Sequence, residues 1–174
     1  MTGDDANSIQ FDAFFGECYP GLVRYLQHML RDSSRAAEDV AQDAFIILWR
    51  KWETTVRDHP SPKAYLYTVA RHLAYDTMEA LSRVGLKPDL LGLVVAEDSP
   101  SDSWDTKMAV QEAIKKLPER QREAVTLFHI HGFPQDEIAI IMNIARGSVG
   151  ALIHQGRKRL TGLIGWLPGE RTNL

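Results

Sequence analysis

Carboxylate and amide side chains recur at helical spacing between positions 39 and 46. Four residues separated by three, four and seven positions share one face of a helix; they are Asp39, Gln42, Asp43 and Ile46. Such a face can pair with Arg and Lys side chains of a partner helix. The alternative is an acidic face that is simply solvated. No further ligands accompany Asp39 and Asp43, so we expect no metal site.

A second group of side chains, in residues 62–83, combines aromatic rings with basic groups. This combination suits single-stranded nucleic acid, because base stacking on aromatic rings contributes about 1–3 kcal/mol per base. The candidate contacts are Tyr67, Arg71, His72, Tyr75 and Arg83. We expect Leu66, Val69, Ala70, Leu73 and Thr77 to form the buried stripe of the same helix. An aromatic ring next to such a stripe is often a core residue, so Tyr67 has a structural interpretation as well.

A third group lies in residues 134–160, which have the layout of a helix-turn-helix. Asn143 stands at the sharp turn, where a residue that tolerates positive φ is required. The expected inward residues of the second helix are Val149, Leu152, Ile153 and Leu160. Its outward residues would meet the major groove or phosphates and include Ser148, Ala151, His154, Gln155, Arg157 and Lys158. An ordinary helical hairpin with a solvated basic end is the alternative.

Helical periodicity along most of the chain predicts an all-α fold. The first helix would carry an apolar stripe from Phe11 to Met29, interrupted near Pro20-Gly21, and Asp32 or Ser33 would cap the next one. Gly132 is a candidate left-handed helix cap. Further helices are expected at about 35–52, 62–83, 105–116, 119–131, 135–143 and 146–163.

The charge distribution predicts two small helical domains joined by a flexible acidic linker. Residues 1–83 carry 9 basic and 12 acidic side chains, residues 84–106 carry 1 and 5, and residues 107–174 carry 10 and 6. The middle segment mixes Gly, Pro, Ser and Asp, as linkers do. We therefore expect domains at 8–84 and 107–165 with the linker at 85–106, in which Leu90–Val95 forms an apolar patch.

Several protein classes are excluded by composition. The single cysteine, Cys18, excludes a disulfide framework and a CxxC-type zinc site. The first ten residues are acidic and polar, unlike a signal peptide, and no apolar stretch is long enough for a membrane span, so we expect a cytoplasmic protein with no membrane insertion. No phosphate-binding glycine loop, catalytic triad or metal motif is present. We expect neither enzymatic activity nor a cofactor.

Two segments resemble sigma factors of bacterial RNA polymerase. LPERQREAVTLFHIHGFPQDEIAIIMNIARGSVGALIHQGRKRL, residues 117–160, resembles their promoter −35 domain through Leu117-Pro118, Arg122-Glu123, Gly132, Glu137-Ile138-Ala139 and the final Arg-Lys-Arg-Leu. DSSRAAEDVAQDAFIILWRKW, residues 32–52, resembles the polymerase-binding segment, and PKAYLYTVARHLAYDTMEALSR, residues 62–83, the −10 segment. The likeness covers about residues 10–162 and points to the extracytoplasmic-function (ECF) group.

Basic residues are fewer here than in the family pattern. Gly150, Leu152 and Gln155 stand where Lys or Arg is usual, and residues 79–82 lack the usual arginines. Each lost phosphate contact weakens DNA binding.

The resemblance implies a sigma factor whose partners are core RNA polymerase, promoter DNA and an anti-sigma factor. Asp39, Gln42, Asp43 and Ile46 would bind polymerase, and the set from Tyr67 to Arg83 would contact the −10 element. The −35 contacts would be Arg122, Arg146, Ser148, Ala151, His154, Gln155, Arg157 and Lys158. One alternative is a sigma mimic that binds an anti-sigma factor or polymerase without reading DNA. A plain helix-turn-helix regulator is a second alternative, but it leaves the N-terminal motif unexplained.

Overall fold

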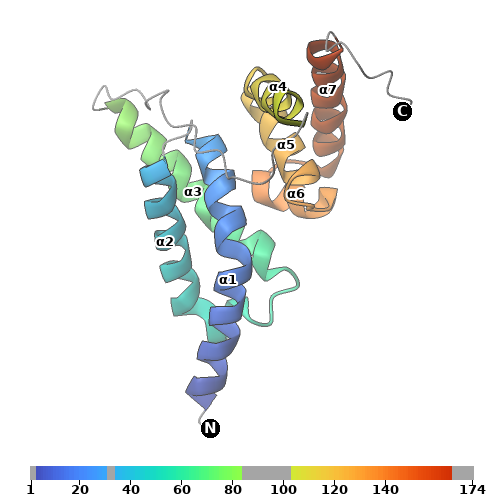
Figure 1. The fold of residues 1–174 in the computed structure, drawn as a ribbon. Helices are drawn as coiled ribbons and strands as arrows, with labels where there is room; N and C mark the ends of the chain where they lie inside the picture. Colours follow the sequence, from blue (N-terminus) through green and yellow to red (C-terminus); the bar gives the residue numbers. More distant parts are fainter. Residues whose placement is uncertain (1–2, 31–33, 84–102, 166–174) are drawn as a thin grey trace. The chain divides into compact units, whose positions relative to one another are not determined.

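The computed structural model describes residues 3–30, 34–83 and 103–165, and the elements in these ranges are all helical (Figure 1). The chain forms two compact units. The first contains α1 (Gly3–Met29), α2 (Ser34–Lys51), one π-helical turn η1 (Trp52–Val56) and α3 (Pro62–Arg83). The second is built from α4 (Ser103–Lys115), α5 (Glu119–His129) and α7 (Arg146–Ile164), and includes residues 135–139 of α6 (Gln135–Met142). The predicted all-α class is confirmed.

Two sequence expectations fall partly or wholly outside the described residues. The capping residue for α2, Asp32 or Ser33, lies there, and so does the apolar patch Leu90–Val95. The segment predicted as a linker, 85–106, is described only at its end, where α4 already begins at Ser103. That helix therefore starts about two residues earlier than its periodicity indicated.

Helix α1 is continuous through Pro20, so the predicted interruption near Pro20-Gly21 is wrong. A proline inside a helix removes one N–H and conflicts with the carbonyl of the residue four positions before it. Here that residue is Gly16, and both Gly16 and Pro20 are exposed, so water can reach the carbonyl that loses its partner. The opposite side of the helix buries Cys18, Leu22 and Leu26, and this packing holds the helix together.

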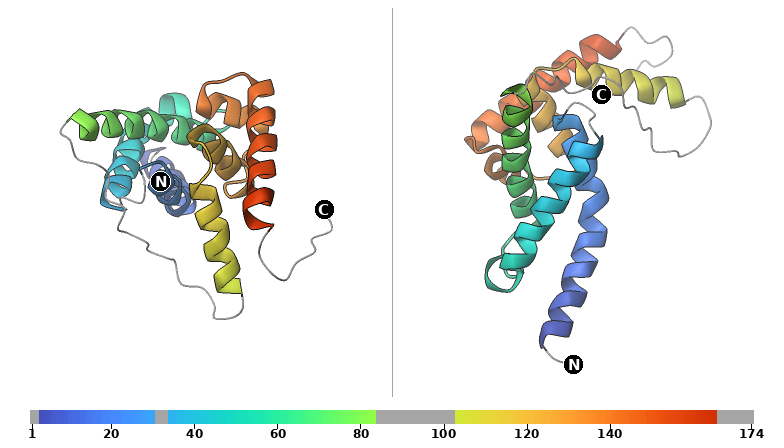
Figure 2. Two further views of the ribbon diagram at one scale, coloured as in Figure 1. Left: turned by 90° about the horizontal axis from the view of Figure 1, so that it is seen from above. Right: turned by 90° about the vertical axis from the view of Figure 1, so that its left-hand side faces the viewer.

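The core of the first unit lies between α1, α2 and α3, which pack against one another in pairs (Figure 2). Phe45 of α2 is its aromatic centre. Four rings of α1 approach it at centroid distances of 4.7 to 6.3 Å; they are Phe11, Phe14, Phe15 and Tyr19. Tilted and edge-to-face aromatic pairs add about 0.5–1.5 kcal/mol each beyond the burial of their area. These rings join α1 firmly to α2, the helix that carries the acidic face.

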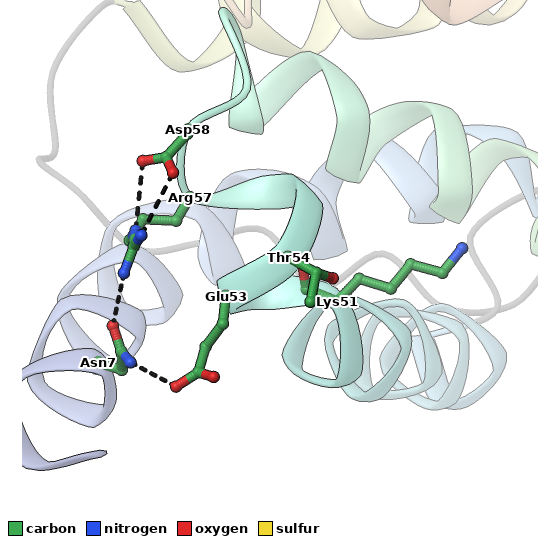
Figure 3. Close-up of polar contacts among 6 residues, drawn as sticks. All are labelled: Asn7, Lys51, Glu53, Thr54, Arg57 and Asp58. Atoms are coloured by element: carbon green, nitrogen blue, oxygen red, sulfur yellow. Dashed lines mark hydrogen bonds and ion pairs between the residues drawn. The ribbon is translucent and has the colours of Figure 1, made fainter. Parts of the chain in front are cut away.

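A polar cluster at the end of α2 fixes the start of α1 (Figure 3). The N–H of Arg57 donates to the carbonyl of Trp52 at 2.9 Å, which closes the π turn. Asn7 of α1 donates to the Glu53 carboxylate and accepts from Arg57 Nη1 at 3.1 Å. Arg57 also binds Asp58, and this hydrogen bond together with the charge of Arg57 lowers the pKa of Asp58. The sequence did not indicate the π turn.

In the second unit α7 packs against both α5 and α4. Of the residues predicted to face inward, Val149 and Ile153 are buried, whereas Leu152 and Leu160 are only partly buried. Gly156 is buried as well. A Cβ atom at Gly156 would lie 2.5 Å from Val125 Cγ2 of α5. This glycine therefore permits a closer approach of the two helices than an alanine would.

Candidate protein and nucleic-acid interfaces

The acidic face predicted on α2 is exposed to solvent. Asp39, Gln42 and Asp43 all lie on the surface, and Ile46 exposes 49% of its area. In the described part of the chain no ion pair or hydrogen bond of the two aspartates is found, so both carboxylates remain available to a partner. The other faces supply the core through Val40, Ala44, Phe45 and Leu48.

Trp49 extends this face and was absent from the predicted site. It follows Ile46 by three positions, exposes 48% of its area and rests on Phe11 at a centroid distance of 4.8 Å. Trp49 could have been predicted from the sequence, because the helical spacing that places Asp39, Gln42, Asp43 and Ile46 on one side of α2 also places Trp49 there. The exposed face thus has an acidic end and an apolar end, which suits an amphipathic partner helix with basic residues.

Tyr67 belongs to the core of the first unit. It exposes 1% of its area, its ring lies 5.1 Å from that of Tyr25, and burial raises the pKa of its hydroxyl. The expectation that Tyr67 contacts a base is therefore wrong. The buried stripe of α3 includes Ala64, Tyr67, Ala70 and Ala74, whereas Val69, Leu73 and Thr77 are only partly buried. Three of the buried residues are alanines, which a search for large apolar side chains does not single out. The predicted stripe was therefore centred on the wrong side of the helix, at Val69, Leu73 and Thr77.

Arg71, another predicted −10 contact, is also buried, with 8% of its area exposed, so it does not lie on the exposed surface of α3. The guanidinium carbon lies 4.6 Å from the centroid of the Tyr75 ring, and Nη2 donates to the Tyr75 hydroxyl at 3.3 Å. Cation–π attraction and this hydrogen bond together hold Arg71 against its own helix. His72 and Arg83 are exposed, but Arg83 forms an ion pair with Glu79 at 2.5 Å.

The turn between α6 and α7 has the geometry of a helix-turn-helix. Asn143 has φ of 51°, as its position in the sequence predicted, and the N–H of Ile144 donates to the carbonyl of Ala139 at 3.0 Å. Gly132 has φ of 70°, and beyond it the N–H of Phe133 donates to the carbonyl of Leu127 at 3.0 Å. Gly132 is thus left-handed as predicted, but α5 ends at His129 with Ile130 as its C-cap, so this glycine lies two residues beyond the cap position.

The face of α7 predicted to meet DNA is exposed throughout the described helix. Its surface residues are Ser148, Ala151, His154, Gln155, Arg157 and Lys158. Burial and the nearby charge of Arg157 lower the pKa of His129, at the end of α5. Near neutral pH His129 therefore carries less positive charge than a solvent-exposed histidine would.

Three of the predicted −35 contacts already have partners within the protein. Arg122 is partly buried and donates to the carbonyl of Lys115 at 3.4 Å. Arg146 Nε lies 2.7 Å from Asp136 Oδ1, and Gln155 Oε1 accepts from Gln121 Nε2 at 3.0 Å. Gln121 and Asp136 were not among the predicted site residues, because their roles depend on contacts between helices.

Within the described ranges, no helix is long and apolar enough to cross a membrane. Those ranges also hold no group of three or more His, Cys, Asp or Glu side chains arranged to bind a metal ion. Two exposed charged faces stand out in the described ranges: the acidic face of α2 and the basic face of α7.

Comparison with known proteins matches both units. The family models for Sigma-70 region 2 and Sigma-70, region 4 match residues 14–84 and 107–160. The chain is 29% identical over 145 residues to the ECF RNA polymerase sigma factor SigM of Bacillus subtilis, covering 82% of this chain and 87% of that protein. It is 26% identical over 165 residues to the RNA polymerase sigma factor CarQ of Myxococcus xanthus, covering 92% of each.

A solved structure extends the likeness to three dimensions. The sigma factor RpoE from Bartonella quintana, in complex with the anti-sigma factor NepR, has a TM-score of 0.70 at 25% sequence identity. The match covers 91% of this chain and 98% of that one.

Proposed function

The chain belongs to the ECF group of sigma-70 factors, and from this premise we propose that it binds core RNA polymerase and directs it to promoters. Sigma factors are initiation factors and not enzymes. The observation that carries the proposal is that each unit carries a charged surface of a different kind. An exposed acidic face lies on α2 of the first unit, and an exposed basic helix-turn-helix face lies on α7 of the second.

Each unit has its own task in this proposal. The domain at 8–84 binds polymerase through Asp39, Gln42, Asp43 and Ile46, and contacts the −10 element through His72, Tyr75 and Arg83. The domain at 107–165 contacts the −35 element through α7, and residues 85–106 link the two. A protein that works on polymerase acts in the cytoplasm. An anti-sigma factor is a further proposed partner, because RpoE of Bartonella quintana is bound by one.

A sigma mimic remains the second candidate, and two ion pairs favour it. Arg83 at the end of α3 is paired with Glu79, and Arg146 at the start of α7 is paired with Asp136. Both arginines belong to surfaces assigned to DNA, and both carry a neutralising carboxylate. Together with Gly150, Leu152 and Gln155, which replace basic residues of the family pattern, these pairs reduce the positive charge available to phosphates.

Run-off transcription with purified core polymerase and a library of −35 variants separates the two candidates. In a sigma factor, substitution of Ser148, His154 or Gln155 changes the preferred −35 sequence, by about 1–3 kcal/mol per lost base contact. Alanine at Arg157 or Lys158 instead weakens all promoters alike and reduces the salt dependence. A mimic binds polymerase but gives no promoter-dependent transcript, and none of these substitutions changes its behaviour.

A further inference from the structure

The side chains of Gln121 and Gln155 meet between α5 and α7, 34 positions apart in sequence. Gln121 is buried, with 7% of its area exposed, whereas Gln155 lies on the exposed face of α7. Gln121 Nε2 donates to Gln155 Oε1 at 3.0 Å. The buried amide of Gln121 therefore holds the exposed amide of Gln155 through a hydrogen bond.

The close approach of the two helices at Gly156 makes this contact possible. A Cβ atom at Gly156 would lie 3.5 Å from the Gln121 carbonyl oxygen and 3.7 Å from Gln121 Cβ. The backbone of α7 thus passes directly beside Gln121, one residue beyond Gln155. The position of Gln121 is set by core packing, so Gln155 has a fixed hydrogen-bond partner.

The direction of this hydrogen bond follows from what is buried. Gln121 Oε1 is buried and has no hydrogen-bond partner in the described part of the chain. The opposite orientation would satisfy this oxygen but leave the amide nitrogen, with its two N–H groups, buried without a partner. Among backbone groups, buried N–H groups without partners are rarer than under-satisfied carbonyls, and we apply the same preference to this side-chain amide. Gln155 therefore turns its carbonyl toward α5 and its amide nitrogen away from it.

We propose that Gln121 positions Gln155 as a hydrogen-bond donor, so that α7 favours guanine over adenine at one position of the promoter. The inference rests on the proposed function. A glutamine reads adenine by accepting from N6 with Oε1 while donating to N7 with Nε2. With Oε1 turned toward Gln121, it cannot lie opposite adenine N6 while Nε2 faces N7, so Gln155 loses this paired contact and can only donate from Nε2. Guanine offers this donor two adjacent acceptors in the major groove, O6 and N7. Adenine offers only N7, next to the N6 donor, and cytosine N4 needs an acceptor from the protein.

The test is run-off transcription by the holoenzyme on a library in which each −35 position carries all four bases. Wild type should favour G over A at one position by about fivefold, the ratio that corresponds to roughly 1 kcal/mol. Gln121→Met keeps a side chain of similar length but cannot form the hydrogen bond. Because this variant frees Gln155 Oε1, transcription from templates with adenine at that position should rise. The ratio of transcription with G to transcription with A should fall toward one. Gln155→Ala should abolish the preference there.

The matched control is Val125→Ala, which loosens the same contact between α5 and α7 without changing either amide. It should lower transcription from all library members alike, because general loosening has no reason to favour one base. The inference is overturned if wild type prefers A or C at the Gln155-dependent position, or if Gln155→Ala changes no position. It is also overturned if Gln121→Met retains the wild-type profile, or if Val125→Ala shifts the base preference as Gln121→Met does. A wild-type holoenzyme without promoter-dependent transcripts refutes the proposed function itself.

Discussion

Arg146 at the start of α7 and Asp136 in α6 form an ion pair across the helix-turn-helix, with Nε 2.7 Å from Oδ1. The two side chains are 71% and 69% exposed. An ion pair so open to water contributes about 0–1 kcal/mol to stability. Its larger effect is electrostatic, because it places a carboxylate beside an arginine on the surface that we propose contacts the phosphates of promoter DNA.

Removal of this carboxylate should strengthen DNA binding. Asp136→Asn leaves Arg146 free to pair with a phosphate, so affinity for promoter DNA should rise and its salt dependence should steepen by about 0.9 in log–log slope. Binding of the holoenzyme to a promoter, titrated at several salt concentrations, measures both. Glu112→Gln makes the same change of charge in α4 and should leave the slope unaltered. An Asp136→Asn slope equal to that of wild type would show that Arg146 does not meet a phosphate.

The acidic face of α2 should carry the affinity for polymerase. Replacing Asp39 and Asp43 with Lys places positive charge against a basic partner and should cost several kcal/mol, on the order of a hundredfold or more in affinity. The measurement is equilibrium binding to core polymerase. Asp12→Lys combined with Glu17→Lys makes the same change on exposed positions of α1 and serves as the control. Equal losses for both double variants would mean that net charge, and not this face, determines binding.

Gly150 of α7 offers a position where positive charge can be restored. A Cβ atom there would lie 3.4 Å from Gln135 Oε1, an ordinary contact, so a larger residue fits. Gly150→Lys should strengthen promoter binding and steepen its salt dependence. Gly150→Ala should add up to about 1 kcal/mol of stability from helix propensity without that change in slope. If both variants bind DNA equally well, the gain comes from the helix and not from the charge.

Gly156 should not tolerate an alanine. The added methyl group would lie 2.5 Å from Val125 Cγ2, and such overpacking costs about 1–3 kcal/mol, more than helix propensity returns. Urea unfolding of Gly156→Ala should therefore show a lower free energy of unfolding than wild type. Gly162→Ala, in the same helix with nothing within 4 Å of the added atom, should be neutral or stabilising. Adding Val125→Ala should recover part of the loss, and equal stability of the two alanine variants would contradict the close packing.

Cys18 should be inert in the folded protein and should make stability fall at alkaline pH. Burial, reinforced by the charge of Glu17, raises the pKa of the Cys18 thiol from 9.0 to about 11. The folded state then binds more protons than the unfolded state between these values, so stability declines as pH rises from about 9 to 11. Cys18→Ala should flatten this decline, as measured by urea unfolding at successive pH values. Rapid modification of the native thiol by a cysteine reagent at pH 8 would show that Cys18 is not buried.

Local signals in the sequence predicted most of the fold. Helix positions followed from apolar periodicity and from the prolines between elements. The positive φ values of Asn143 and Gly132 were also predicted, because few residue types accept that conformation. The exposed acidic face of α2 followed from spacing alone, since residues three, four and seven positions apart must share a side of any helix. Each of these properties depends on residues within a few positions of one another.

Contacts between distant segments decided the rest. Nothing near Tyr67 in sequence reveals that Tyr25 covers its ring, and α1 remains continuous at Pro20 because of what its opposite side packs against. Gly156 lacks a side chain that any apolar pattern would register, yet it determines how closely α5 and α7 approach. Sequence alone could place Gln155 on the outer face of α7. Only the tertiary structure, by bringing Gln121 within 3.0 Å, determines which end of that amide faces outward.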